Sequence, residues 1–118
     1  LVSGGALLFP SLMRPKGALS TLQATQLLNQ GKVTILDVRT PEEFRGGHLR
    51  QSKNIPLDQL GERIGELDKG LPALVVCAAG PRAARAAAQL RRAGFGEVYV
   101  LGGGFGEWQA QGLPTAKA

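Results

Sequence analysis

The sequence predicts an α/β domain with a central, mostly parallel sheet and helices on both of its faces. Short apolar runs of strand length alternate along the chain with stretches of helical pattern, which is the order typical of a parallel sheet. The strand runs are continuously apolar, as expected for strands that are buried on both faces. At 118 residues, with 43% hydrophobic and 19% charged residues, the chain fits one globular domain.

The first half of the chain predicts two helices around one buried strand. Ser20 and Gln23 form a capping-box pattern, so a helix begins there, and it ends at Gly31. The β-branched apolar run 33–38 predicts a buried strand. The run 40–43 then provides an N-cap threonine, a proline at the first helical position and two acids in the first turn, which predicts a short helix.

The second half continues the same alternation, with no internal repeat or domain boundary. In chain order its predicted elements are an extended segment at 54–56, a helical stretch at 57–67, a strand at 74–77, a helix at 82–93, a strand at 98–101, a loop at 102–106, a short helix at 107–110 and an exit at 112–114. Ligands of parallel sheets bind outside the carboxyl ends of the strands. Cys77, the run 37–39 and the glycines 102–104 all lie at such ends, so we expect one site there.

Cys77 is the only cysteine and precedes a glycine loop and a helix. The N–H groups and the positive dipole end of a helix stabilise an anion at that point, which favours a thiolate and a nucleophilic sulfur. Gly80 permits a tight loop and Pro81 suits the first helical position. The alternative is a buried strand-end cysteine that acts as a small hydrophobic residue.

Three blocks of sequence, in order, resemble those of rhodanese-like sulfurtransferases. They are Leu36 to Phe44 followed by Gly47-His48-Leu49 and Asn54-Ile55-Pro56; Cys77 to Arg82; and Val100 to Trp108 closed by Gly112-Leu113-Pro114. Together they span roughly residues 20–114. The resemblance implies the three-layer rhodanese-like fold of a single-domain sulfurtransferase. The apolar N-terminal run 1–12 is similar to that of bacterial members with an N-terminal membrane anchor.

The resemblance implies that Cys77 takes the sulfane sulfur of thiosulfate or a similar donor as a persulfide and passes it to cyanide or a thiol. The loop residues that would bind substrate are Ala78, Ala79, Gly80, Pro81 and Arg82. Two other classes remain open: a sulfur carrier or partner-binding module with little turnover, and a cysteine-dependent phosphatase of the related fold. Phosphatase loops have five residues between cysteine and arginine, whereas this chain has four.

Asp37, Arg39 and His48 are expected to support the site, and Arg82 has two possible roles in it. Arg82 either neutralises an anionic donor or pairs with Asp37 or a glutamate. Asp37 is expected to be a structural partner at the strand end. Arg39 matches a family arginine that organises the neighbouring loops. His48 matches a family position that is usually structural, and a catalytic cysteine–histidine pair is the alternative.

The chain departs from the family pattern at two places. Ala78 and Ala79 follow the cysteine, where many family members have charged or hydrogen-bonding side chains. We therefore expect weak anion binding and poor use of thiosulfate. Gln51 and Ser52 replace a small glycine–alanine pair that often precedes the Asn-Ile-Pro segment.

Charge and composition bound the partners. The net charge is +5, which suits a small anionic sulfur donor. The few aromatic residues do not alternate with basic ones, so we expect no nucleic-acid partner. One cysteine allows neither an internal disulfide nor a zinc site of paired cysteines, which fits a reducing compartment. We expect no cofactor or metal, and an acceptor protein as a further partner.

Residues 1–19 are assigned to a leader and residues 20–118 to the rhodanese-like domain. The run 1–12 is apolar and is followed by Arg14 and Lys16, but a membrane helix needs about 20 residues. The leader is interpreted as the remnant of a membrane anchor with a cytoplasmic flank, as a processed leader, or as a disordered stretch foreign to the domain. The expected location is the cytoplasm, or the cytoplasmic face of the inner membrane.

Overall fold

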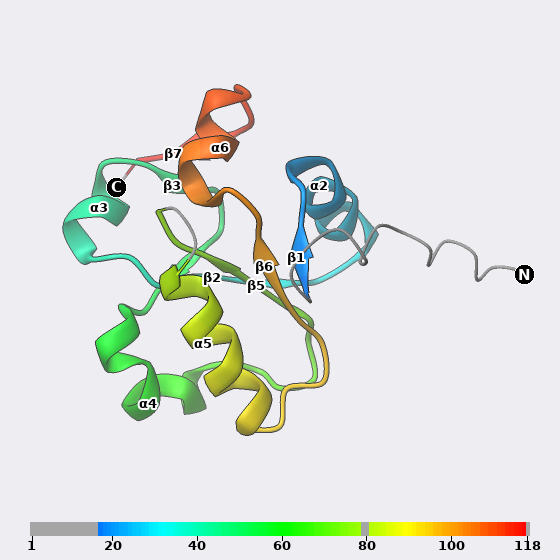
Figure 1. The fold of residues 1–118 in the computed structure, drawn as a ribbon, viewed down its shortest axis with the longest axis vertical. Helices are drawn as coiled ribbons and strands as arrows, with labels where there is room; N and C mark the ends of the chain where they lie inside the picture. The colour runs from blue at the N-terminus through cyan, green and yellow to red at the C-terminus, as the bar shows by residue number, and fades with distance from the viewer. Residues whose placement is uncertain (1–16, 79–80, 118) are drawn as a thin grey trace, which may run out of the picture.

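The computed structural model describes residues 17–78 and 81–117, which form an α/β domain (Figure 1). Its main sheet has five strands in the order β1-β6-β5-β2-β4, and all four pairings are parallel. The strands are β1 (Ala18–Leu19), β2 (Thr34–Asp37), β4 (Lys53–Asn54), β5 (Ala73–Val76) and β6 (Val98–Leu101). The mostly parallel α/β sheet predicted from the sequence is therefore confirmed.

Helices cover both faces of this sheet, so the domain has three layers. Figure 1 shows α4 (Leu60–Arg63) and α5 (Pro81–Arg92) on one side, with α2 (Thr21–Gln30) and α6 (Gly104–Ala110) on the other. An apolar core lies on each face of the sheet, and successive residues of one strand point into opposite cores. Leu36 of β2 packs with α4 and α5, whereas Ile35 packs with α2 and α6. Because both of its faces are buried, the central strand β5 is apolar at every position, as its sequence indicated.

Several expected boundaries agree with the structure to within a residue or two. The capping box of α2 is present, since the side chain of Ser20 accepts from the Gln23 N–H and the Gln23 side chain accepts from the Ser20 N–H. The expected N-cap Thr40 and the proline at the first helical position are present in α3 (Pro41–Arg45), and Thr40 and Glu43 also form a capping box there. The helical stretch from residue 57 divides into the 3₁₀ turn η2 (Leu57–Gln59), helix α4 and the 3₁₀ turn η3 (Ile64–Glu66).

Four short elements differ from expectation. Helix α6 begins at Gly104, inside the segment 102–106 that was predicted as a loop. The prediction missed this first turn because it contains glycines, which are poor helix formers. Strands β3 (His48–Leu49) and β7 (Thr115–Ala116) form a separate antiparallel pair. Strand β1 lies within the segment that we assigned to the leader, and its Leu19 carbonyl accepts from the Gly102 N–H at 2.7 Å.

Residues 1–16 lie outside the described part of the chain, and so does the expectation of an anchor remnant at 1–12. Within residues 17–78 and 81–117, none of the helices has the length and apolar character needed to cross a bilayer.

Candidate active site

Cys77 follows the last residue of β5 and lies at the centre of the carboxyl edge of the sheet. It is 1% exposed. Its carbonyl oxygen accepts from the Phe105 N–H at 2.8 Å, which joins the end of β5 to the start of α6. Helix α5 begins four residues later, at Pro81. The predicted loop residues Ala79 and Gly80 lie outside the described residues, so the anion-binding cradle stays a prediction.

Gly104 explains how the third sequence block comes so close to the cysteine. It has φ +63, and a Cβ built there would lie 2.5 Å from the carbonyl oxygens of both Cys77 and Ala78. Such a distance is far inside van der Waals contact, so only glycine fits without displacement of the backbone. The expected close turn at the glycines 102–104 is present at this residue.

Asp37 and Arg39 form a fully buried ion pair at the end of β2. Arg39 Nε donates to Asp37 Oδ1 at 3.0 Å and Nη2 donates to Oδ2 at 2.8 Å, while Nη2 also donates to the Gly47 carbonyl at 2.7 Å. The Arg39 guanidinium lies 4.4 Å from the centre of the Phe105 ring. Asn54 donates to the carbonyls of both Asp37 and Arg39, each at 3.0 Å. This network ties the loops around the strand end together, which is the role expected for Arg39.

Arg82 pairs with a glutamate, one of the alternatives left open by the sequence. Its Nη1 and Nη2 donate to Glu43 Oε1 and Oε2 at 2.9 and 3.1 Å, while Asp37 is engaged by Arg39. The same Glu43 Oε1 accepts from the Thr40 N–H at 2.8 Å. The sequence indicated Glu43 only as a first-turn acid of α3, because its partner lies 39 positions away.

The charges of this pair are mutually stabilised. Hydrogen bonds from Arg82 lower the pKa of Glu43 from 4.5 to about 2, with further lowering by Thr40, while burial opposes the shift. The Glu43 hydrogen bonds raise the pKa of Arg82 above its usual value, and the nearby Cys77 and Asp37 add smaller contributions in the same direction. Each charge of the pair therefore stabilises the other, and Glu43 compensates the Arg82 charge.

His48 is held by α3. Its Nδ1 lies 2.6 Å from the Phe44 carbonyl oxygen, an arrangement in which Nδ1 carries the proton. Its ring stacks on Phe44 with the centroids 3.7 Å apart and the planes 6° from parallel. The residue is 8% exposed and belongs to β3, which pairs with β7. These contacts hold the His48 ring against α3 and fix the segment that follows this helix.

A cleft of about 710 Å³ opens beside Arg82 on the α5 side of the sheet. Its lining includes Val38 and Thr40 after β2, Leu57 and Asp58 of η2, and Arg82 and Arg85 of α5. Arg85 and Asp58 are both exposed. Among the described residues, no cluster of histidine, cysteine, aspartate and glutamate has the arrangement to hold a metal ion.

Comparison with known proteins identifies the class. Residues 20–111 match the family model of the rhodanese-like domain, and the chain belongs to this family. The thiosulfate sulfurtransferase GlpE of Shewanella oneidensis is 37% identical over 90 residues, which cover 76% of this chain and 89% of GlpE. The family relationship thus includes sulfurtransferases that carry that activity in their name.

Two further relatives show how far the similarity extends. The protein YqhL of Bacillus subtilis is 44% identical over 77 residues, which are 65% of this chain and 61% of YqhL. The crystal structure of a rhodanese-related protein from Thermoplasma volcanium has a TM-score of 0.77 and 29% identity, and covers 84% of this chain and 96% of that one. The rhodanese-like fold expected from the sequence is confirmed by this agreement.

Proposed function

We propose that this protein is a sulfurtransferase that carries sulfane sulfur as a persulfide on Cys77. The observation that carries the proposal is the position of this sole cysteine. It follows β5 at the carboxyl edge of the sheet and precedes α5, in a chain of the rhodanese-like family. The similarity to GlpE favours thiosulfate, or a donor of the same kind, as the source of sulfur.

The reaction has two displacement steps. In the first, the Cys77 thiolate attacks the outer sulfur of thiosulfate; a new S–S bond forms, the old one breaks, and sulfite leaves with the electron pair. In the second, cyanide or an acceptor thiolate attacks the outer sulfur of the persulfide. That S–S bond breaks, Cys77 regains its electron pair, and thiocyanate or an acceptor persulfide is released. A thiolate nucleophile requires no partner base in either step.

Arg82 at the start of α5 places a positive charge near Cys77. Its interaction with Cys77 is electrostatic, and the bidentate contact with Glu43 fixes the direction of its guanidinium group. A fixed positive charge stabilises the anionic sulfur of the resting enzyme and the anionic donor as it approaches. Arg82 therefore acts through position as well as charge.

Mass spectrometry of the intact protein tests the proposal directly. After the protein is mixed with thiosulfate, its mass is expected to increase by one sulfur atom, and cyanide is expected to restore the original mass with formation of thiocyanate. Cys77→Ser is expected to keep the fold and to lose both changes, since a hydroxyl cannot form a persulfide. Absence of the mass increase with thiosulfate and with other sulfane donors would exclude the mechanism.

The same experiment separates the alternative functions. A sulfur carrier would gain the sulfur but release it slowly in the presence of cyanide or thiols. A phosphatase would show no sulfur gain and would hydrolyse an aryl phosphate in a Cys77-dependent way. We expect repeated turnover to thiocyanate and no hydrolysis of the phosphate ester.

A further inference from the structure

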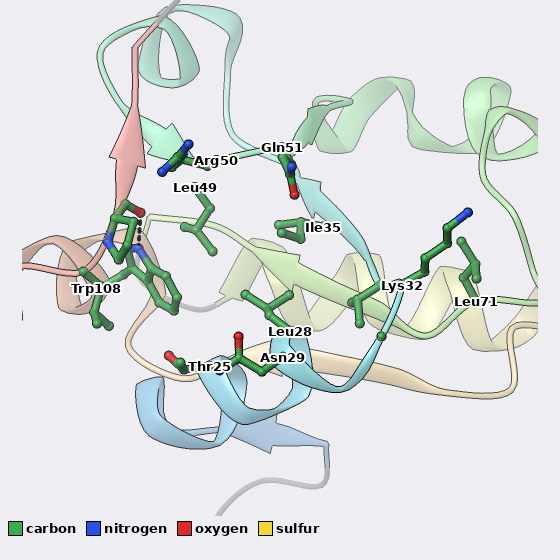
Figure 2. A pocket seen from close by; sticks show the side chains of 14 residues that line it. Thr25, Leu28, Asn29, Lys32, Ile35, Leu49, Arg50, Gln51, Leu71 and Trp108 are labelled. Atoms are coloured by element: carbon green, nitrogen blue, oxygen red, sulfur yellow. Dashed lines mark hydrogen bonds between the residues drawn. The ribbon is translucent and has the colours of Figure 1, made fainter.

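A second hollow lies on the opposite face of the sheet from the cleft beside Arg82. It has a volume of about 660 Å³ and lies between the C-terminal half of α2, the start of β2, the turn after β3, and α6 (Figure 2). We call it the α2 groove. Its floor is formed by Ile35, Leu49 and Trp108, which are 7%, 1% and 4% exposed. An apolar hollow of this size is large enough for an apolar side chain of a partner.

The charged residues that line the α2 groove are both cations. Lys32 precedes β2 and Arg50 follows β3, and both are exposed. Neither forms an ion pair or hydrogen bond within the part of the chain that the structure describes. Figure 2 shows Arg50 near Trp108 and Lys32 near Leu71, at opposite ends of the apolar floor. The groove therefore has an apolar centre with a positive charge at each end.

Gln51 provides an independent observation at the same place. It has φ +64 and is the one non-glycine residue with a positive φ among residues 17–78 and 81–117. A side chain in this left-handed region costs roughly 1 kcal/mol, and a glycine would avoid that cost. The Gln51 side chain lies on the rim of the α2 groove between the two cations (Figure 2). The presence of glutamine at this strained position, where glycine would be favoured, points to a binding role for its side chain in the groove.

We propose that the α2 groove binds an acidic peptide segment of a partner protein, with an apolar residue on the floor and acidic residues on either side. The apolar residue would contact Ile35 and Trp108, the acidic residues would pair with Lys32 and Arg50, and the Gln51 amide would bond to the peptide backbone. A small carboxylate would reach one cation and leave the other unused. A second copy of this chain, with its net charge of +5, would bring like charge to the groove. The inference does not depend on the chemistry of Cys77.

The experiment uses Trp108 as a reporter, because it is the sole tryptophan and lines the groove. The protein is titrated with the unlabelled peptide Gly-Asp-Asp-Leu-Leu-Asp-Asp-Gly while the tryptophan emission is recorded. We expect a saturable change of emission, and none with the counterpart in which lysine replaces each aspartate. The double variant Lys32→Glu, Arg50→Glu should bind the acidic peptide at least about tenfold more weakly, equivalent to about 1.4 kcal/mol.

A matched control separates the groove from the overall charge. The double variant Arg45→Glu, Arg92→Glu has the same net charge, and both residues are exposed and lie outside the groove lining. Its affinity for the acidic peptide should remain within about twofold of that of the original protein, because salt screens charges that lie far from the groove. Equal weakening in both double variants, or no saturable change with the acidic peptide, would overturn the proposal. Binding of octanoate with dependence on Lys32 and Arg50, without binding of the peptide, would overturn it in favour of a small-molecule site.

Discussion

Glu43→Gln tests whether the contact between α3 and α5 positions Arg82. The amide that replaces the carboxylate keeps the shape of Glu43 and one oxygen acceptor, but it loses the charge and the bidentate contact. Both side chains of the pair are 36% exposed, so solvent screening limits its contribution to stability to about 0.5–1 kcal/mol. Urea unfolding at pH 7 should show a loss of this size.

The effect on sulfur transfer should exceed what this small loss of stability explains. Without the second oxygen, the Arg82 guanidinium is no longer fixed relative to Cys77, and misplacement of a positioning group lowers the rate. We expect kcat/KM for thiocyanate formation from thiosulfate to fall about fivefold to tenfold, with the protein fully folded. Arg82→Lys should show a similar fall, since it keeps the charge and loses the bidentate fork.

Glu66→Gln is the matched control. Glu66 accepts from Arg63, and its contacts with Arg63 and Lys53 also lower its pKa to about 2. The residue lies outside the lining of the cleft beside Arg82. Its variant should leave kcat/KM unchanged. If Glu43→Gln lowers stability as expected but leaves kcat/KM unchanged or raised, Glu43 has no positioning role and our reasoning on Arg82 is refuted.

The pH dependence of stability gives the same pair an independent readout. The folded-state pKa of Glu43 is about 2, below its ordinary value of 4.5. A lowered pKa means that the contribution to stability is fully present above about pH 4.5 and is lost as the pH falls through 2. The difference in unfolding free energy between the original protein and Glu43→Gln should therefore be constant above pH 5 and should disappear towards pH 2.

Three further substitutions test the packing around the site by urea unfolding. Gly104→Ala should lower the unfolding free energy by at least about 2 kcal/mol, because its Cβ would meet two carbonyl oxygens at a positive φ; a smaller loss would mean that the two loops separate easily. Gln51→Gly should raise the unfolding free energy by about 0.5 kcal/mol, because relief of the positive φ outweighs the greater entropy of glycine in the unfolded chain. A decrease would contradict the strain assigned to Gln51. Arg39→Lys should cost about 3 kcal/mol, since lysine cannot make both contacts with Asp37 and still reach Gly47; retained stability would show that the fork is dispensable.

The buried strands and the helix starts could be predicted because their signals are local. Strand β5 is apolar at every position, since both of its faces are covered. The capping boxes at Ser20 and Thr40 each lie within four residues. Cys77 was identified for the same reason, since its strand, loop and helix are contiguous in the sequence.

The contacts between distant segments could not be read in this way. Glu43 and Arg82 are ordinary residues of two helix starts, and their pairing follows from the parallel order of β2 and β5. The pairing of His48 with Ala116 involves strands of two residues each, which are too short to show a periodic pattern. The family resemblance marked Gln51 as a departure from the expected pattern, and only the structure shows that its backbone has a positive φ, which favours glycine.

The arrangement around Glu43 has a consequence for the choice of substrate. One carboxylate oxygen accepts from both the Thr40 N–H and the Arg82 guanidinium, so the starts of α3 and α5 form one hydrogen-bonded unit beside the cysteine. With its pKa near 2, Glu43 stays ionised at neutral pH and compensates the Arg82 charge. Ala78 adds no polar side chain. On the proposed mechanism, the remaining field of Arg82 must be supplemented by backbone N–H groups and by Arg85 in the cleft to attract a small anion, which favours donors or acceptors large enough to contact that cleft.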